Sequence, residues 1–336
     1  MARDRFLQMF WMLHVGNDNV QGVTEALKRM RKIHGMIEKI ENLFQKYFVP
    51  GRNIAIDEST VGFKGKVIFK TYNPKKPTKW GIRIFVLADS DTGYVHSIIP
   101  YYGKHTSDIC NLPHTEKSFT SHIVLSLMDR LELCVSGIDG YHLFTDRYYS
   151  SVELAQELVK KQCHTTGTII ARRSGNPNEI RWGGSEKKEE SGDTCAFRNG
   201  NVLIMGWKDK RAVLMISTLH NTEMQMKGGQ QREVEKPACV LDYTKNMGGV
   251  DRSDHYCATY VFIRKSLKWW RKLFFWCLEV CIVNSYILYC CHTTQHGGTP
   301  MSHLKYRRTL VENLVGDTHT IPGNEVIPGQ HRQKSD

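Results

Sequence analysis

The sequence has 336 residues, of which 46 are Lys or Arg and 34 are Asp or Glu, so the formal net charge is +12 at pH 7. This length suffices for about two domains or for one domain with an insertion, and the positive charge favours polyanionic partners. A hydrophobic share of 40% and a charged share of 24% exclude a disordered or low-complexity chain. Ten cysteines without a regular spacing argue against a small secreted scaffold held by disulfide bonds.

Neither a signal peptide nor a membrane span is expected. The N-terminus, MARDRFLQMFWMLHV, carries two arginines and an acid within its first five positions and has a broken apolar run. The most membrane-like stretch, residues 273–291, holds Glu279 and Asn284 near its middle. These polar residues favour a buried helix, so no membrane partner is expected.

Hydrophobic spacing predicts helices at both ends of a group of strands. Residues 1–52 are expected to be helical, because apolar residues recur every three or four positions from Val23 to Phe44 and Pro50 would end the helix. β-Branched and aromatic runs predict consecutive antiparallel strands at 54–56, 67–72, 82–87 and 94–99. A helix at 118–133, a strand at 141–145 and a helix at 152–161 follow.

Residues 172–235 break this order with glycine-rich turns and the polar tract GGSEKKEESGD between strand-like runs. They predict a β-rich insertion. Residues 250–291 are again compatible with helix, and the last 20 residues are expected to be disordered.

Three aspartates lie where a rigid element can hold a side chain. Asp57 and Asp146 end apolar runs, and Asp251 begins a helical segment, where Asp254 would share its face. Carboxylates gathered from distant segments repel unless a cation neutralises them, and an all-oxygen donor set suits Mg²⁺ or Mn²⁺. The pattern indicates metal-dependent phosphoryl transfer, although each acid alone is more typical of a strand end, a helix cap or a solvated first turn.

Two stretches without acidic residues concentrate positive charge. The first lies between Glu58 and Asp89, and the second lies between Asp254 and Glu279. Basic side chains neutralise phosphates and aromatic faces stack on unpaired bases, so the second stretch suits a distorted or single-stranded DNA end. A solvated helix face with core tryptophans explains it equally well. The basic and aromatic residues are Lys64, Lys66, Lys70, Lys75, Lys76, Lys79 and Arg83, then Phe262, Arg264, Lys265, Lys268, Trp269, Trp270, Arg271 and Lys272.

Several blocks resemble the signature blocks of piggyBac-type DNA transposases and their host-domesticated descendants. They are IAIDESTVGFKGKVIFKTYNPKKPTKWGIRIFVLADSDTGYV, FTDRYYSS and NMGGVDRSDHY followed by KSLKWWRK, in order over roughly residues 1–295. The resemblance implies an α/β, RNase H-like catalytic core with a β-rich insertion and flanking helices. It implies a helical N-terminal segment at 1–52 that is part of a dimerisation or DNA-binding region, a catalytic domain at 53–171 and 236–295, an insertion at 172–235, and a partly disordered tail at 296–336.

The same resemblance assigns site residues. Asp57, Asp146 and Asp251 match the three catalytic aspartates that bind Mg²⁺ or Mn²⁺, with Asp254 as an additional metal ligand. Trp269 matches a tryptophan that supports a DNA hairpin intermediate. Arg147 stands where asparagine is frequent, which changes the charge beside the second aspartate. The residues expected to bind DNA are Lys64, Lys66, Lys75, Lys76, Arg264, Lys265, Lys268, Trp269, Arg271 and Lys272.

The resemblance implies cut-and-paste transposition of DNA, with transposon ends and TTAA targets as partners, a nuclear location and a homodimer as one assembly that it allows. The family's cysteine-rich zinc module has no counterpart, because no cysteine follows Cys291 and C-x-x-C spacing is missing, so no structural zinc is expected. A shortened copy is therefore one expectation. A domesticated, non-catalytic DNA-binding or chromatin-associated protein is the alternative.

Overall fold

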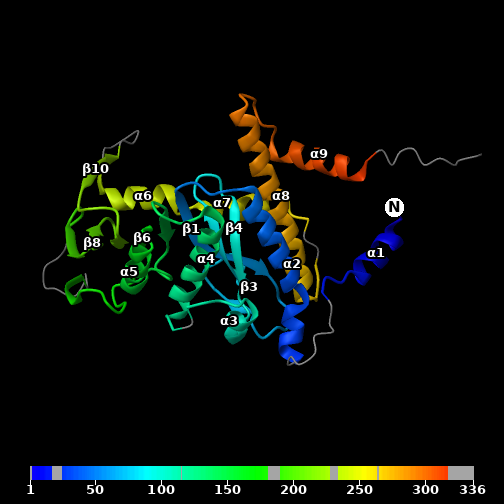
Figure 1. Ribbon diagram of the computed structural model, residues 1–336, viewed down its shortest axis with the longest axis horizontal. Helices are drawn as coiled ribbons and strands as arrows, with labels where there is room; N and C mark the ends of the chain where they lie inside the picture. The colour runs from blue at the N-terminus through cyan, green and yellow to red at the C-terminus, as the bar shows by residue number, and fades with distance from the viewer. Residues whose placement is uncertain are drawn as a thin grey trace, which may run out of the picture. The chain divides into compact units, whose positions relative to one another are not determined.

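A computed structural model describes residues 2–16, 25–114, 116–180, 190–227, 234–262 and 265–316. The chain divides into two units, one ending at Leu288 and one beginning at Tyr289. The strands and most helices belong to the first unit (Figure 1).

The strands are, in chain order, β1 (Asn53–Gly62), β2 (Thr71–Tyr72), β3 (Trp80–Asp89), β4 (Val95–Pro100), β5 (His142–Thr145), β6 (His164–Thr168), β7 (Thr194–Asn199), β8 (Val202–Lys208), β9 (Ala212–Ser217), β10 (Met224–Lys227) and β11 (Val234–Pro237). The helices are α1 (Arg3–Met12), α2 (Glu25–Tyr47), α3 (Thr106–Ile109), α4 (Phe119–Val135), α5 (Val152–Lys160), α6 (Ala238–Asn246), α7 (Gly249–Thr259), α8 (Trp269–Gln295) and α9 (His303–Val315), with short 3₁₀ turns η1 (Gly103–His105) and η2 (Asn178–Ile180).

One large sheet organises the first unit. Its strands lie in the order β2-β3-β1-β5-β6-β9-β8-β7, and β4 pairs with β3. The β1–β3 and β3–β4 pairs are antiparallel, whereas the β1–β5 and β5–β6 pairs are parallel. Strands β4, β3, β1, β5 and β6 therefore form the mixed sheet that an RNase H-like core requires.

The sheet is covered on both faces. Every residue of β4 is buried, and β3 is buried from Gly81 to Asp89 apart from Arg83. Consecutive buried residues point to alternate faces of a strand, so both faces must be shielded from water. Helices α2 and α4 pack against β4 (Figure 1).

Buried polar contacts fix two helices on β4. The Glu41 carboxylate of α2 accepts a hydrogen bond from the Ile98 N–H at 3.1 Å and pairs with Arg130 of α4 at 2.6 Å. In α8, the Asn284 side chain donates to the Val95 carbonyl at 2.8 Å and accepts from the Val95 N–H at 3.0 Å. Asn284 is thus a polar residue of an apolar helix that completes the backbone hydrogen bonding at the start of β4.

Helix α8 is, within the described residues, the one helix that is long and apolar enough to cross a membrane by length and composition. Its residues Leu273, Val280, Val283 and Asn284 are nevertheless buried against the protein. Glu279 is buried as well. The prediction of a buried helix at 273–291 agrees with this packing.

The structure differs from the sequence predictions in three elements. Only Thr71–Tyr72 of the strand expected at 67–72 forms, because residues 67–70 make a turn in which the Lys70 N–H donates to the Val67 carbonyl oxygen at 3.3 Å. The helix expected at 250–291 is interrupted between α7 and α8, where Phe262 lies against Phe275 with ring centroids 6.1 Å apart. The expected tail contains α9, which the Ser302 side chain caps by accepting from the Lys305 N–H. Residues 317–336, expected to be disordered, lie outside the described residues.

The region expected to be an insertion does not form a sheet of its own. Strand β9 pairs antiparallel with β6, so β9, β8 and β7 extend the main sheet. Only β10 and β11 form a separate two-stranded sheet in the described part of the chain. The boundaries 172–235 stay a prediction.

Candidate active site

The first two candidate aspartates lie side by side on neighbouring strands. The parallel β1–β5 register pairs Asn53 with His142 and ends with Ile56 opposite Thr145, and Asp57 and Asp146 follow these last partners. Strand β1 continues to Gly62 along β3, so Asp57 lies within its strand and not at its end. Because β5 ends at Thr145, Asp57 has no paired residue from β5 beside it. This gap beside β1 leaves room for a site.

Burial and neighbouring carboxylates disfavour ionisation of both acids. Burial and the neighbouring Glu58 carboxylate, with a further contribution from Asp146, raise the pKa of Asp57 to about 8. Burial likewise raises the pKa of Asp146, against hydrogen bonds from the backbone N–H groups of Tyr148 and Tyr149. The two carboxylates therefore repel each other in a poorly hydrated position when no cation is present.

Helix α7 brings the other two aspartates to β1. A Cβ atom at Gly249 would lie 2.9 Å from the Asp89 carbonyl oxygen, so the close approach of the first turn of α7 to the end of β3 requires glycine. The Ser59 hydroxyl of β1 donates to Asp254 Oδ1 at 2.6 Å. Burial raises the pKa of Asp254 to about 6. Asp251 is exposed in the first turn of α7.

The negative charges of the three candidate catalytic acids all act on one buried phenol, that of Tyr243. Burial raises the pKa of Tyr243 to about 12, and the negative charges of Asp146, Asp57 and Asp251 contribute to that rise. Each of these carboxylates therefore lies near enough to Tyr243 for its charge to act on the phenol. The tertiary structure thus gathers acids that are far apart in the sequence.

The donor set fits hard divalent cations. All candidate ligand atoms are carboxylate oxygens, which Mg²⁺ and Mn²⁺ prefer, and a cation would offset the cost of burying negative charge that raises the pKa values of Asp57 and Asp146. Among the described residues, these acids do not form a group whose ligand atoms all lie within 4.8 Å of one another.

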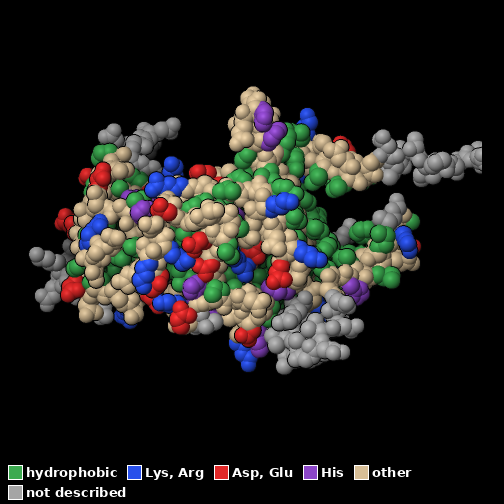
Figure 2. Space-filling view, viewed as in Figure 1, with side chains coloured by type: hydrophobic (Ala, Val, Ile, Leu, Met, Phe, Trp, Pro, Cys, Tyr) green, Lys and Arg blue, Asp and Glu red, His purple; other side chains and the backbone are tan. Residues whose placement is uncertain are grey.

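The two basic stretches meet in one groove. A hollow of about 630 Å³ is lined by Lys64, Lys79 and Trp80 from the first stretch and by Lys265 and Lys272 from the second. We call this hollow the basic groove. In contrast, acidic and basic side chains are intermixed on the face that Figure 2 shows.

A second hollow links the basic groove to the acids. It has a volume of about 550 Å³ and shares Gly62 and Lys272 with the basic groove, and its lining includes Lys76 and Asp254. Lys76 also donates to the Glu58 carbonyl oxygen at 3.1 Å and lies 3.7 Å from its carboxylate. Positive charge therefore extends from the groove to the residue beside Asp57.

The remaining residues expected to bind DNA are placed differently. Lys64, Lys66, Lys75, Lys265 and Lys268 are exposed, which suits contacts to phosphate. Trp269 is partly buried and meets Phe69 edge-on, with ring centroids 5.0 Å apart. Arg264 lies outside the described residues.

Arg271 departs most from expectation. Its exposed fraction is 0%, and its guanidinium lies 4.9 Å from the Phe10 ring centroid and 5.4 Å from that of Trp11. It also donates to the Trp11 carbonyl oxygen at 2.7 Å. The expectation that Arg271 contacts DNA is therefore corrected, because the side chain holds α1 against α8 and has no surface to offer to phosphate.

Comparison with known proteins identifies the family. The family described as transposase IS4 matches residues 1–286. This chain belongs to that piggyBac-type transposase family. Human piggyBac transposable element-derived protein 3 is 26% identical over 339 residues, which cover 98% of this chain and 54% of the relative. Human piggyBac transposable element-derived protein 2 is 24% identical over 309 residues, which cover 88% of this chain and 50% of the relative.

The fold agrees with this membership. A piggyBac transposase solved by cryo-electron microscopy in a synaptic complex with hairpin DNA superimposes with a TM-score of 0.81 at 23% identity. The match covers 98% of this chain and 70% of that one, which confirms the α/β fold class with an RNase H-like core. The chain spans about half the length of the curated relatives it matches.

Sequence reasoning missed several residues of the site in this family member. Glu58 lies beside Asp57, and its carboxylate accepts a hydrogen bond from the Tyr149 hydroxyl at 3.1 Å. Tyr243 lies among the aspartates, although only its position upstream of the NMGGVD block could have indicated it. Glu58 could have been found from the sequence, because it directly follows Asp57. Arg147 is exposed, and its charge favours ionised Asp146 only weakly compared with the effect of burial.

Proposed function

We propose that this protein catalyses metal-dependent cleavage and transfer of DNA strands, as in cut-and-paste transposition at TTAA sites. The observations that support the proposal are the adjacent positions of Asp57 and Asp146 beyond the β1–β5 register, the hydrogen bond from Ser59 of β1 to Asp254 of α7, and a groove lined by lysines from two distant segments. Phosphodiester chemistry needs clustered carboxylates for divalent cations and positive charge for the polyanionic substrate. Both features lie together here.

In this proposal, Asp57, Asp146 and Asp251 hold Mg²⁺ or Mn²⁺, and Asp254 supports the site. The bound cations supply Lewis-acid activation of water and of the attacking 3′-hydroxyl. The Ser59 hydroxyl orients Asp254 through its 2.6 Å hydrogen bond. Tyr149 orients Glu58, which keeps this additional carboxylate pointed at the positive charge of Lys76.

The basic groove supplies the path for DNA. Exposed Lys64 and Lys265 neutralise phosphates, and Trp80 offers an aromatic face at the same hollow. Trp269 supports a DNA hairpin at the end of this path. Transposon ends and TTAA targets are the proposed substrates, a homodimer is the proposed assembly, and the nucleus is the proposed location. The solved relative is named as a synaptic complex with hairpin DNA, which supports a DNA partner.

The decisive experiment incubates the purified protein with a duplex that carries a TTAA-flanked transposon end, with Mg²⁺ or Mn²⁺, and resolves nicks and hairpins on a denaturing gel. Wild type should cleave only when the cation is present. Asp57→Asn and Asp146→Asn should abolish cleavage while DNA affinity stays equal or rises, because each removes a metal ligand and a negative charge. Asp139→Asn, in an exposed turn after α4, is the matched control and should cleave like wild type.

A non-catalytic DNA-binding protein is the alternative, and the basic groove favours it equally because lysines bind DNA without the acids. Under this alternative, wild type binds the duplex but gives no cation-dependent product. Cleavage that persists in Asp57→Asn would instead show that the acids have been assigned wrongly.

A further inference from the structure

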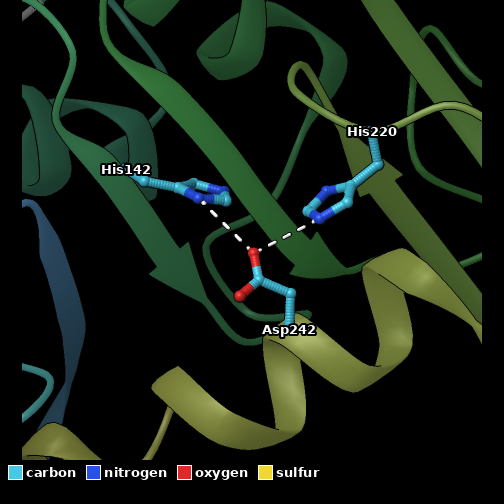
Figure 3. A group of neighbouring side chains, drawn as sticks. All are labelled: His142, His220 and Asp242. Atoms are coloured by element: carbon cyan, nitrogen blue, oxygen red, sulfur yellow. Dashed lines mark ion pairs between the residues drawn. The ribbon is translucent and has the colours of Figure 1, made fainter.

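A second cluster of metal-ligating side chains lies apart from the acids. Among the described residues, His142, His220 and Asp242 form the one group of three His, Cys, Asp or Glu side chains whose ligand atoms all lie within 4.8 Å of one another. They come from the start of β5, from the loop after β9 and from α6, and both imidazoles face the same carboxylate (Figure 3).

The distances within the cluster suit a small cation. Asp242 Oδ2 lies 3.6 Å from His142 Nδ1 and 3.3 Å from His220 Nε2. Ligands at the usual Zn–N and Zn–O lengths in a tetrahedral site are about 3.4 Å apart. Both separations match this value, so a metal ion requires little movement of these pairs.

Each ligand is oriented by a hydrogen bond on its far side. His142 Nε2 lies 2.8 Å from the Thr166 hydroxyl, and His220 Nδ1 lies 2.9 Å from the Ser217 hydroxyl. The two hydroxyls are themselves 2.9 Å apart, because Thr166 and Ser217 are paired in the β6–β9 register. These contacts assign the far nitrogen of each ring to a hydroxyl and leave the other nitrogen facing the carboxylate, as around metal-ligating histidines.

The carboxylate is held in the same way. The Asn246 side chain, which is buried, donates to Asp242 Oδ1 at 2.7 Å, so Oδ2 is left for the two imidazoles.

We propose that His142 Nδ1, His220 Nε2 and Asp242 Oδ2 bind a divalent transition-metal ion of the Zn²⁺ class, at a site separate from the acidic one. Two imidazoles and one carboxylate select such an ion over Mg²⁺. A hollow of about 420 Å³, lined by His220, Asp242 and Glu223 among others, opens onto the cluster and gives water access to a fourth coordination position. The expectation of no structural zinc rested on cysteine spacing, which does not bear on histidine and aspartate ligands.

The site has a structural consequence. The ion ties α6 to β5 and to the loop after β9, and α6 carries Tyr243 directly after Asp242. Binding at the cluster therefore holds the helix that presents Tyr243 to the three aspartates. This role is independent of the proposed DNA chemistry, because it concerns the stability of α6 and not the substrate.

The test is a titration of the chelator-treated full chain with Zn²⁺, and separately with Co²⁺, in excess Mg²⁺, which occupies the oxygen-only site and competes poorly for imidazole. Wild type should bind one Zn²⁺ that His220→Gln or Asp242→Asn each lose. Co²⁺ should give intense visible absorption bands typical of tetrahedral nitrogen and oxygen ligands. Zn²⁺ should raise the melting temperature of wild type and leave that of both variants unchanged.

One control concerns other histidines. His292 and His296 are exposed one turn apart near the C-terminal end of α8, where Figure 2 shows histidine side chains in purple, and such a pair can bind Zn²⁺ weakly. His296→Gln should therefore keep the tight Zn²⁺ equivalent and the Co²⁺ bands. Thr166→Val, which retains all three ligands, should weaken Zn²⁺ binding about 10- to 100-fold.

The wild-type spectrum alone decides the matter if the ligand variants fail to fold. Without tetrahedral Co²⁺ bands, or with a Zn²⁺ equivalent that survives in His220→Gln, the proposal is overturned and the cluster is an ion-paired group without metal. Loss of DNA cleavage does not enter into this test, so the two proposals can fail separately.

Discussion

Asp57 and Asp146 lie at adjacent positions of two parallel strands, directly beyond the last paired residues Ile56 and Thr145. Neighbouring strands are about 4.8 Å apart, so two carboxylates in this register repel strongly when both are ionised. The β1–β5 pairing therefore builds charge repulsion into the metal-free protein. A divalent cation bound between the acids would remove this repulsion.

The first prediction concerns the stability of the metal-free protein. The pKa of Asp57 is raised from 3.8 to about 8, so ionising it disfavours the folded state. Protonated Asp57 contributes fully to the free energy of unfolding below about pH 4, and this contribution is lost as the pH rises to about 8. Asp57→Asn cannot ionise, so we expect it to be more stable than wild type by a few kcal/mol at pH 8 and nearly equal to it at pH 4.

Thermal unfolding of both proteins in chelator at the two pH values measures this difference. Asp139→Asn removes an exposed carboxylate and should show no such pH dependence. A gain in melting temperature for Asp57→Asn that is the same at both pH values would contradict the argument from burial.

The second prediction concerns DNA affinity. The double variant Lys64→Ala/Lys265→Ala removes one lysine from each basic stretch in the basic groove. Each lost phosphate contact should reduce the magnitude of the salt slope by about 0.9, because fewer counterions are released on binding. Fluorescence anisotropy with duplex DNA between about 50 and 200 mM salt measures the slope. Lys160→Ala, on α5, is the matched control, and an equal effect there would mean that the groove has no special part in binding.

The third prediction separates Arg271 from its basic neighbours. Arg271→Ala removes the stacking on Phe10 and Trp11 and the hydrogen bond to Trp11. It should destabilise the fold by about 2 kcal/mol or more and speed hydrogen exchange in α1, with little change in the salt slope of DNA binding. Lys268 is exposed three residues earlier. Lys268→Ala should reduce the salt slope of DNA binding and leave fold stability and hydrogen exchange in α1 unchanged. Unchanged exchange in α1 would mean that Arg271 does not hold this helix.

The fourth prediction concerns the buried amide of α8. Asn284→Ala leaves the Val95 N–H and carbonyl without their partners, so we expect a loss of about 1–3 kcal/mol in the free energy of unfolding. Ser285→Ala removes a hydroxyl that donates to the Ile282 carbonyl oxygen within the same helix, and it should cost less. Urea unfolding of the two variants compares them directly. Equal losses in the free energy of unfolding would mean that the Asn284 contact to Val95 is no more important than a hydrogen bond within the helix.

The order of the elements could be predicted because it depends on local patterns. Apolar residues at helical spacing in α2, including Ile33, Ile37 and Phe44, are buried. Alternating and apolar runs located β1, β3, β4 and β5, and the motif blocks indicated the family that the comparisons confirm. These features are encoded within a few residues of one another, so periodicity and turn chemistry are enough to find them.

The sequence by itself thus determined which residues carry charge, where most helices and strands form, and which family the chain belongs to. Only the tertiary structure decided that Arg271 is buried between α1 and α8 while Lys265 lines a groove with Lys64. It alone brought Asp242 to His142, 100 residues earlier in the chain, because α6 packs beside β6 and β9. The physical reason is that contacts between distant segments depend on strand order and register, which local spacing does not encode.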